Sequence, residues 1–246
     1  MTTNILEMRG ITKTFPGVKA LSNVTIGVER GEVHAICGEN GAGKSTLMKV
    51  LSGVHPAGTY DGEIHFEGRP VEFHNIRDSE HAGIVIIHQE LALIPEMSIA
   101  ENIFLGNETA SGGVINWLAT RVKARELLAR VGLEEEPDTK IRDIGVGKQQ
   151  LVEIAKALSK DVKLLILDEP TRGIDVGAKY EIYTIINRLA DEGKAILVIS
   201  SELPELLGIC DRIYALSAGR ITGEVTRAEA TQERLMLFMT HVQESA

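Results

Sequence analysis

At residues 38–45 the sequence is Gly38-Glu39-Asn40-Gly41-Ala42-Gly43-Lys44-Ser45, which fits the pattern G-x-x-x-x-G-K-[ST]. Glycines at these positions let the backbone bend around a chain of phosphates with its N–H groups pointing inward. Lys44 can then neutralise the β- and γ-phosphates of a nucleotide, and the Ser45 hydroxyl can bind Mg²⁺. The alternative is a glycine-rich turn with an exposed lysine, and the flanking sequence decides between the two.

The motif stands between a predicted strand and a predicted helix, which is the setting that a phosphate-binding loop requires. The strand is the apolar run Val33–Cys37, and the helix covers residues 43–51. Continuous apolarity predicts further buried strands, typical of a parallel sheet covered on both faces, at Ile84–Ile87, Leu164–Leu167 and Ala195–Ile199. Apolar residues recur at helical spacing in 124–131, 151–158 and 182–189. The sequence therefore predicts an α/β fold.

The first part and the middle of the chain differ from this core. Residues 5–35 and 58–75 alternate apolar and polar residues between glycine turns, and Asp61–Gly68 is typical of a hairpin. We therefore expect an antiparallel sheet beside the parallel one. Residues 90–160 favour helices and include a loop at Gly106–Gly113. We predict one domain over residues 1–246, with an inserted helical lobe at about 90–160.

Two acids follow the apolar run Leu164–Leu167, at Asp168 and Glu169. Ligands of a parallel sheet collect at the carboxyl ends of its strands. Asp168 is placed to hold Mg²⁺, directly or through water, and Glu169 to orient or polarise an attacking water. Alone, such a pair is more often a solvated turn, but beside the phosphate-binding loop it indicates a nucleoside triphosphatase.

Composition and charge limit the possible partners. Lys and Arg total 26 against 35 Asp and Glu, which gives a net charge of −9 and no basic footprint for nucleic acid. The longest apolar runs fall far below the ~20 residues of a membrane-spanning helix, and the N-terminus does not resemble a signal peptide. We expect Cys37 and Cys210 to be buried thiols in a reducing cytosol, and His65 and His74 to bind no metal.

Further motifs resemble the ATP-binding cassette (ABC) of membrane transporters. The stretch Lys148–Leu158 precedes the strand that ends at Asp168, as the signature helix does in that family. The resemblance covers nearly the whole chain, and it is to the cassettes of bacterial monosaccharide importers of the ribose, xylose and galactose types. It rests on Phe15-Pro16-Gly17-Val18-Lys19-Ala20-Leu21, Gly38 to Thr46, His88-Gln89-Glu90, Ala100-Glu101-Asn102 and Asp168-Glu169-Pro170-Thr171.

The resemblance implies a site for ATP and Mg²⁺. Phe15 resembles the aromatic residue that stacks on adenine, although a core phenylalanine is the alternative. Gln89 resembles the glutamine that reaches Mg²⁺ and the attacking water, with a surface glutamine as the alternative. The implied catalytic residues are Glu169, Gln89 and Lys44. The implied ATP-binding residues are Phe15, Gly38, Glu39, Asn40, Gly41, Ala42, Gly43, Lys44, Ser45 and Thr46, and the implied Mg²⁺ ligands are Ser45, Gln89 and Asp168.

Three further positions concern contacts between two cassettes and hydrolysis. Asp175 resembles the aspartate at the seam of the cassette dimer, and it would alternatively cap a helix that begins near Gly177. The family signature usually has a serine where this chain has Gly145, so the contact with the partner's nucleotide is expected to be weaker. The family usually has a histidine where this chain has Ser201, and serine is shorter and cannot become cationic.

These departures suggest a composite chain. Importers of this group commonly have two cassettes in one chain of about twice this length. Residues up to about 170 resemble the first cassette, whereas Thr171–Lys179 and Ser200–Pro204 resemble the second. We hypothesise an internal deletion or fusion near Asp168-Glu169-Pro170-Thr171, a stretch that both cassettes share.

The function implied by the resemblance is that of an ATP-hydrolysing subunit that powers monosaccharide import, peripheral on the cytoplasmic face of the inner membrane. The implied partners are membrane-spanning permease subunits, indirectly a sugar-binding protein, and a second cassette, either the same chain or another; no nucleic acid is expected. The alternative is a regulatory or catalytically weak cassette, which Gly145 and Ser201 favour and Lys44 and Glu169 oppose. A cassette of DNA repair or translation has no supporting motif. The sequence does not identify the sugar.

Overall fold

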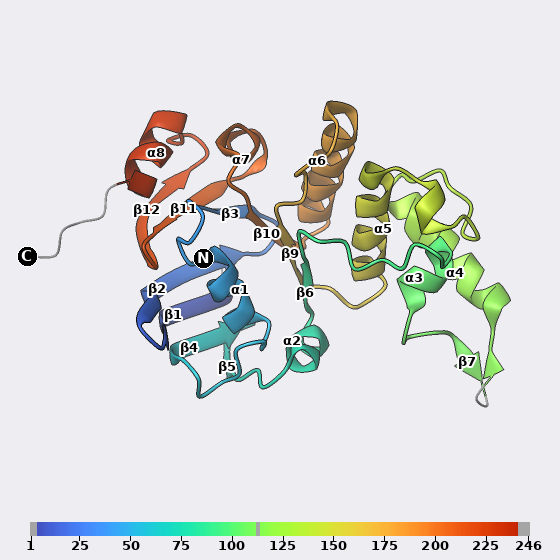
Figure 1. Ribbon diagram of the computed structural model, residues 1–246, viewed down its shortest axis with the longest axis horizontal. Helices are drawn as coiled ribbons and strands as arrows, with labels where there is room; N and C mark the ends of the chain where they lie inside the picture. The colour runs from blue at the N-terminus through green and yellow to red at the C-terminus, as the bar shows by residue number, and fades with distance from the viewer. Residues whose placement is uncertain (1–3, 112–113, 241–246) are drawn as a thin grey trace, which may run out of the picture.

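A computed structural model describes residues 4–111 and 114–240 (Figure 1). Its centre is a six-stranded sheet of order β12-β11-β3-β10-β9-β6. The strands from β11 to β6 are parallel, and β12 runs antiparallel to β11. The strands are β3 (Val33–Cys37), β6 (Ile84–Ile87), β9 (Leu164–Asp168), β10 (Ala195–Ile199), β11 (Arg212–Ser217) and β12 (Arg220–Thr226).

The four apolar runs predicted as buried strands all belong to this sheet, so the predicted α/β core is confirmed. One of them is not central: within the described residues β6 pairs with β9 alone and forms an edge of the sheet. Helix α2 (Ile76–Ala82) and helix α5 (Val146–Leu158) pack against β6. These two helices explain why an edge strand has so apolar a sequence.

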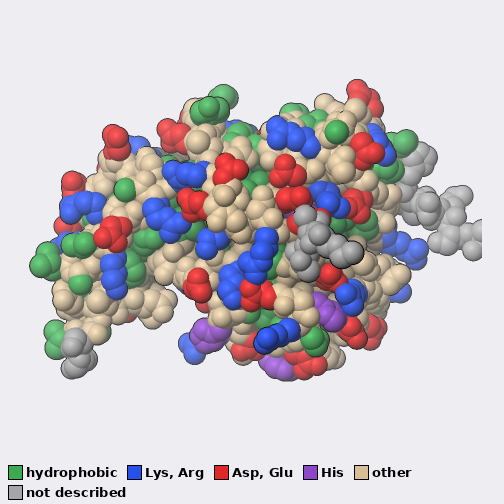
Figure 2. All heavy atoms as spheres, turned by 180° about the vertical axis from the view of Figure 1, so that it is seen from behind, with side chains coloured by type: hydrophobic (Ala, Val, Ile, Leu, Met, Phe, Trp, Pro, Cys, Tyr) green, Lys and Arg blue, Asp and Glu red, His purple; other side chains and the backbone are tan. Residues whose placement is uncertain are grey.

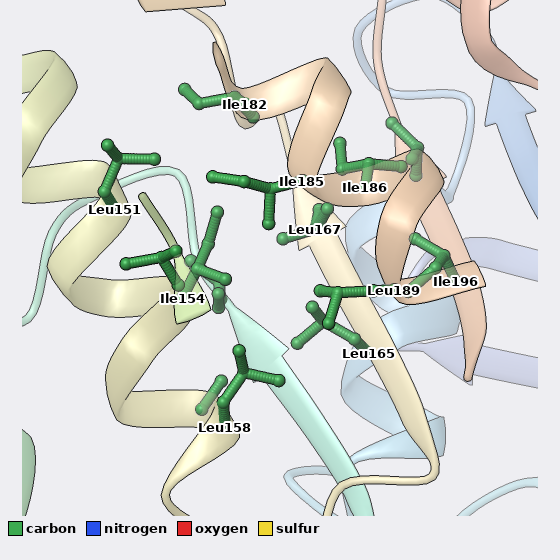
Figure 3. Close-up of a cluster of buried hydrophobic side chains, with 14 of the residues drawn as sticks. Leu151, Ile154, Leu158, Leu165, Leu167, Ile182, Ile185, Ile186, Leu189 and Ile196 are labelled. Atoms are coloured by element: carbon green, nitrogen blue, oxygen red, sulfur yellow. The ribbon is translucent and has the colours of Figure 1, made fainter. Parts of the chain in front are cut away.

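Alternate side chains of the central strands enter two separate hydrophobic cores. Leu165 and Leu167 of β9 join one core, while Leu164 and Ile166 join the other. Figure 3 shows the first core, where α5 and helix α6 (Val176–Asp191) pack over β9 and β10. The helical spacing predicted for 151–158 and 182–189 supplies its apolar residues, which include Leu151, Ile154, Leu158, Ile182, Ile185, Ile186 and Leu189.

The second core lies under an antiparallel sheet, as predicted. Its strand order is β2-β1-β4-β5, and helix α1 (Lys44–Leu51) contributes to the same core. The strands are β1 (Asn4–Phe15), β2 (Val18–Glu29), β4 (Asp61–Phe66) and β5 (Arg69–Val71). The predicted hairpin is present, but its second strand follows the turn at Glu67-Gly68 and ends beyond the predicted range.

Helices dominate between residues 99 and 158, in agreement with the predicted lobe. The lobe contains α3 (Ile99–Phe104), α4 (Trp117–Arg130), a short 3-10 helix η1 (Ile141–Asp143) and α5. The loop predicted at Gly106–Gly113 is partly wrong, because β7 (Ala110–Ser111) pairs with β8 (Val114–Ile115) in a small hairpin. Gly112 and Gly113, the rest of that predicted loop, lie outside the described residues.

The remaining helices are α7 (Leu203–Ile209) and α8 (Gln232–Thr240). In the part of the chain that the structure describes, no helix has the length and apolar character needed to cross a bilayer. Cys37 and Cys210 are both buried free thiols, as predicted, and burial raises the pKa of Cys37 to about 11.

Two buried polar side chains of the helical lobe tether the segment that follows β6. The Asn102 amide oxygen accepts from the Ile94 N–H (2.7 Å), and its NH₂ donates to the carbonyl oxygens of Ile94 (3.1 Å) and Ser98 (2.9 Å). The Glu153 carboxylate of α5 accepts from the Ala92 N–H (2.9 Å). The segment that starts with the predicted site residue Gln89 is therefore fastened to the lobe at two points.

We expect Asn102→Ala to lower the free energy of unfolding by about 2–3 kcal/mol, because it removes the three hydrogen bonds that the fully buried Asn102 amide makes with the Ile94 and Ser98 backbone. Urea denaturation measures this as a lower midpoint at an unchanged slope. Asn107→Ala is the control, because Asn107 is exposed and such substitutions change stability by less than about 0.5 kcal/mol. Equal losses in the two variants would contradict the tether.

Candidate functional site

The predicted phosphate-binding loop connects β3 to α1, as the motif requires. Gly43 has a φ of +110°, in the left-handed region, and a Cβ there would come within 2.8 Å of the Ala20 carbonyl oxygen. A Cβ on Gly38 would come within 2.4 Å of the Leu216 carbonyl oxygen. Both positions therefore need glycine, one for its backbone angle and both for the close approach of neighbouring backbone.

Lys44 lies inside this loop and does not extend into solvent. Its side chain is only 8% exposed, and Nζ donates to the carbonyl oxygens of Gly38 (2.5 Å) and Glu39 (3.1 Å). The alternative of a turn with an exposed lysine is therefore wrong. The hydrogen bonds of α1 begin with the Leu47 N–H, which donates to the Gly43 carbonyl (2.9 Å). The N–H groups before Leu47 at this helix start are free to bind an anion.

Asp168 ends β9 beside two other strand ends. The register pairs it with Ile199 of β10, and the pairing of Ile87 with Leu167 places His88 next to it on the β6 side. Burial raises the pKa of Asp168, and the charge of Glu169 raises it further, while the charges of His88 and Lys44 act in the opposite direction. The loop lysine and the predicted metal ligand thus meet at one edge of the sheet.

Glu169 is half-buried and held in place, unlike an acid in a freely solvated turn. Its φ of +48° lies in the left-handed region, and its N–H donates to the Ile199 carbonyl (2.8 Å). The carboxylate accepts from the Ser201 N–H (3.0 Å) and from the Ser200 hydroxyl (3.3 Å). The structure therefore brings the predicted catalytic acid into contact with the segment where the family has its histidine.

The other predicted nucleotide contacts lie at the surface. Gln89 is exposed and follows His88, the residue that the strand register places next to Asp168. This position near Asp168 agrees with the predicted metal ligand, whereas the exposure agrees with the alternative of a surface glutamine. Phe15 is half-exposed at the end of β1, edge-on to His55 with ring centroids 5.3 Å apart. Phe15 belongs to neither hydrophobic core, so the alternative of a core phenylalanine is wrong.

The two positions predicted to meet a second cassette both lie at helix starts. Gly145 precedes α5, which has no side-chain cap, and a Cβ on Gly145 would have no atom within 4 Å. Asp175 caps α6 by accepting from the Ala178 N–H (3.1 Å), so the capping alternative describes its contact in this structure. Figure 1 shows α5 and α1 well apart, with the strands of the central sheet between them.

Several contacts around the site have no signal in the sequence. Lys179 and Glu205 form an ion pair (2.6 Å) near Glu169, and Glu153 and Asn102 fix the segment after β6. These contacts join residues far apart in the chain, so spacing does not reveal them. One local signal was present: Ser98 and Glu101 form a capping box at the start of α3, and the pattern S-x-x-E is typical of that motif.

The donors at the sheet edge fit a nucleotide with Mg²⁺. Free N–H groups and Lys44 suit phosphate oxygens, and Asp168 supplies a carboxylate. Among the described residues, no group of three or more His, Cys, Asp or Glu is arranged to hold a metal ion. A Mg²⁺ ion here would thus complete its shell with phosphate oxygens and water, which is its usual arrangement beside one or two carboxylates.

Comparisons with known proteins agree with this geometry. Residues 21–172 match the family model described as ABC transporter. The L-arabinose transport ATP-binding protein AraG of Geobacillus stearothermophilus is 57% identical over 237 residues, 96% of this chain and 46% of that protein. The xylose import ATP-binding protein XylG of Moorella thermoacetica is 52% identical over 235 residues, 96% of this chain and 47% of that protein. The chain thus spans about half the length of these curated relatives.

Solved structures show the same fold. A nucleotide-free ATP-binding cassette from an ABC transporter superposes with a TM-score of 0.81 at 28% sequence identity, and covers 98% of this chain and 96% of its own. The family model covers more than half of the chain and includes the phosphate-binding loop, Asp168 at the end of β9 and Glu169 after it. This chain belongs to the ABC transporter family.

Proposed function

We propose that this chain binds ATP with Mg²⁺ and hydrolyses it to power the import of a monosaccharide. One observation supports this proposal above the others: Lys44 with its phosphate-binding loop, Asp168 and Glu169 meet at one edge of the central sheet. The relatives named for L-arabinose transport and xylose import support the class of substrate. We propose further that residues 1–246 form a single nucleotide-binding domain with its helical lobe at about 90–160.

In this proposal the loop residues bind the phosphates and Phe15 contacts the base. The N–H groups at the start of α1 and Lys44 would stabilise the negative charge on the β- and γ-phosphate oxygens in the transition state. Ser45, Gln89 and Asp168 would hold Mg²⁺. When bound, Mg²⁺ neutralises charge on the β- and γ-phosphate oxygens. The nucleotide contacts proposed are Phe15, Gly38, Glu39, Asn40, Gly41, Ala42, Gly43, Lys44, Ser45 and Thr46.

Glu169 would orient the attacking water and accept its proton. A general base must be held within hydrogen-bond reach of the water it activates. The Ser201 N–H fixes one carboxylate oxygen of Glu169, which leaves lone pairs on both oxygens for the water. Ser201 itself has an exposed side chain, and its backbone, not its hydroxyl, contacts Glu169.

The proposed partners follow from what one copy lacks. Because α5 stands apart from α1, the Gly145 region would meet the nucleotide of a second cassette, either another copy or another subunit. Membrane-spanning permease subunits would dock on the chain at the cytoplasmic face of the inner membrane, and a sugar-binding protein would act through them.

Nucleic acid is not among the proposed partners. Figure 2 shows Lys and Arg interspersed with Asp and Glu on the face in view, and such a face has no basic patch that would attract nucleic acid. The hypothesis of a fusion near Asp168–Thr171 stays untested.

The direct test of the proposal is phosphate release by the purified chain with ATP and Mg²⁺, first alone and then enclosed with ATP in permease-containing vesicles that have the sugar-binding protein outside. ATP-dependent accumulation of a pentose or hexose would support import. ATP hydrolysis that no permease stimulates, with no sugar uptake, would contradict the transport part of the proposal and leave the ATPase part standing.

We expect Lys44→Ala to weaken ATP binding roughly ten- to a hundredfold, because a hydrogen bond to a charged group contributes about 1.5–3 kcal/mol. Equilibrium titration with ATP and Mg²⁺ measures this. Lys49→Ala is the control, since Lys49 is an exposed lysine on the same helix and should leave the affinity unchanged. An unaltered ATP affinity in Lys44→Ala would exclude the proposed phosphate site.

Glu169→Gln should retain ATP binding and lower kcat by roughly 10²- to 10⁴-fold, because the amide keeps the shape of the side chain but cannot accept a proton. Single-turnover phosphate release resolves so slow a rate. Glu181→Gln, an exposed position on α6, should behave as the unmodified protein does. Hydrolysis by Glu169→Gln at the unmodified rate would remove Glu169 from catalysis.

Ser201→His should raise turnover roughly ten- to a hundredfold, because an imidazole can reach the γ-phosphate and a charge-assisted contact is worth about 1.5–3 kcal/mol. The exposed side chain at this position leaves room for the larger ring. Ser201→Ala should leave turnover unchanged, since the N–H that contacts Glu169 remains. If Ser201→His also leaves turnover unchanged while Glu169→Gln abolishes it, Ser201 does not occupy the switch position.

A further inference from the structure

A half-buried lysine, Lys179, joins the two segments that flank Glu169. Lys179 lies in the first turns of α6, and its Nζ donates to Glu205 Oε1 (2.6 Å) and Glu202 Oε2 (3.0 Å). Glu202 precedes α7 and Glu205 lies in its first turn. Thr171 also donates its hydroxyl to Glu205 Oε2 (2.5 Å). The chain just after Glu169 and the chain just after β10 are therefore connected through one cation and two acids. We name these four residues, Thr171, Lys179, Glu202 and Glu205, the lysine clamp.

The clamp leads directly to Glu169 through the segment 200–202. The Ser201 N–H and the Ser200 hydroxyl both donate to the Glu169 carboxylate, at 3.0 and 3.3 Å. The Glu202 N–H donates to Ser200 Oγ (3.0 Å), and the Glu202 carboxylate accepts from Lys179. Lys179 and Glu169 are thus connected by a continuous path of hydrogen bonds and the short backbone segment 200–202.

The charges of the clamp hold it together. The hydrogen bond from Lys179 to Glu205 raises the pKa of Lys179 well above its ordinary value. Burial alone would raise the pKa of Glu205, but hydrogen bonds from Lys179 and Thr171 bring it below its ordinary value. Both groups are therefore charged at neutral pH. Without Lys179, the acids Glu202 and Glu205 would repel each other one helical turn apart, and Glu205, whose side chain is only 11% exposed, would lack its cation.

We infer that Lys179 is a positioning residue for hydrolysis: it holds the segment 200–202 so that the Ser201 N–H and the Ser200 hydroxyl fix the carboxylate of Glu169. This inference rests on the proposed ATP hydrolysis. It matters because the segment offers no histidine at Ser201, so its contribution to the site is the placement of Glu169. Lys179 does not touch the phosphate-binding loop through any hydrogen bond or ion pair found in the described residues, so nucleotide affinity should not depend on it.

We expect Lys179→Met to lower kcat roughly ten- to a hundredfold, the loss that a displacement of about 1 Å in a catalytic group can cause, with KM and the ATP dissociation constant unchanged. Lys179→Arg should restore most of kcat, because the guanidinium can reach both acids. Lys163→Met is the matched control. Lys163 pairs with Glu67 (2.8 Å) at the opposite end of β9, so this variant should keep both kcat and KM. Equal kcat values for the methionine variants at 179 and 163 would overturn the inference.

A double-mutant cycle separates positioning from general stability. If Lys179 acts through Glu169, then Lys179→Met should not slow single-turnover hydrolysis further in the Glu169→Gln background, where the base is already missing. A further tenfold loss in that background would show that Lys179 acts by another route, and would overturn the inference. Should Lys179→Met fail to fold, Glu202→Ala takes its place, since it cuts the same path at a side chain that is 44% exposed and should lower kcat in the same way.

Hydrogen exchange at the Ser201 amide tests the clamp without any hydrolysis. This N–H is hydrogen-bonded to Glu169, and its exchange in protein without added nucleotide should accelerate at least about tenfold in Lys179→Met but not in Lys163→Met. Faster exchange in a chain that hydrolyses no ATP would support the clamp and refute the proposed function. Unchanged exchange, together with an unchanged kcat, would refute the clamp and leave the proposed function standing.

Discussion

Burial of the central parallel strands on both faces is the constraint on which the rest of this structure depends. Apart from His34 in β3, the side chains of β3, β9 and β10 before the strand ends alternate between two hydrophobic cores. Charged and catalytic groups therefore gather where these strands end. Because the strands are parallel, their carboxyl ends lie at one edge, and this edge gathers the phosphate-binding loop, Asp168 with Glu169, and Ser200 with Ser201.

The local parts of this arrangement could be predicted from the sequence. The spacing of Gly38, Gly43 and Lys44 specifies a loop between a strand and a helix, and the structure contains that loop. The apolar runs predicted the strands correctly, because a strand that is buried on both faces is apolar along its whole length. The helical lobe and the antiparallel sheet followed from periods of 3.6 and 2 in the same way, and Asp168 and Glu169 were found because they interrupt an apolar run.

The parts that could not be predicted depend on which elements become neighbours. The run Ile84–Ile87 resembles a central strand because α2 and α5 cover it, although it lies at an edge. Strand β12 is only partly buried, so its sequence shows no continuous apolar run. The ion pair of Lys179 with Glu205 joins residues 26 positions apart, and no local pattern of charge reveals such a contact. Asn102 and Glu153 lie in stretches that resemble the family, but their backbone contacts could not be predicted because a polar residue in a helix is usually solvated.

The strand order has a consequence for synthesis of the chain. Strand β10 lies between β3 and β9, so the strand before the phosphate-binding loop and the strand that ends in Asp168 enter one sheet only when residues 195–199 pair with both. A ribosome-bound nascent chain that has emerged only to residue 190 has made both motifs but cannot bring them together. Long-range pairing of this kind is slow and leaves unpaired strand edges exposed in the meantime. A chain of that length has the β6–β9 pair and a β3 without either of its neighbours, so β10, β11 and β12 must all emerge before the central sheet is complete.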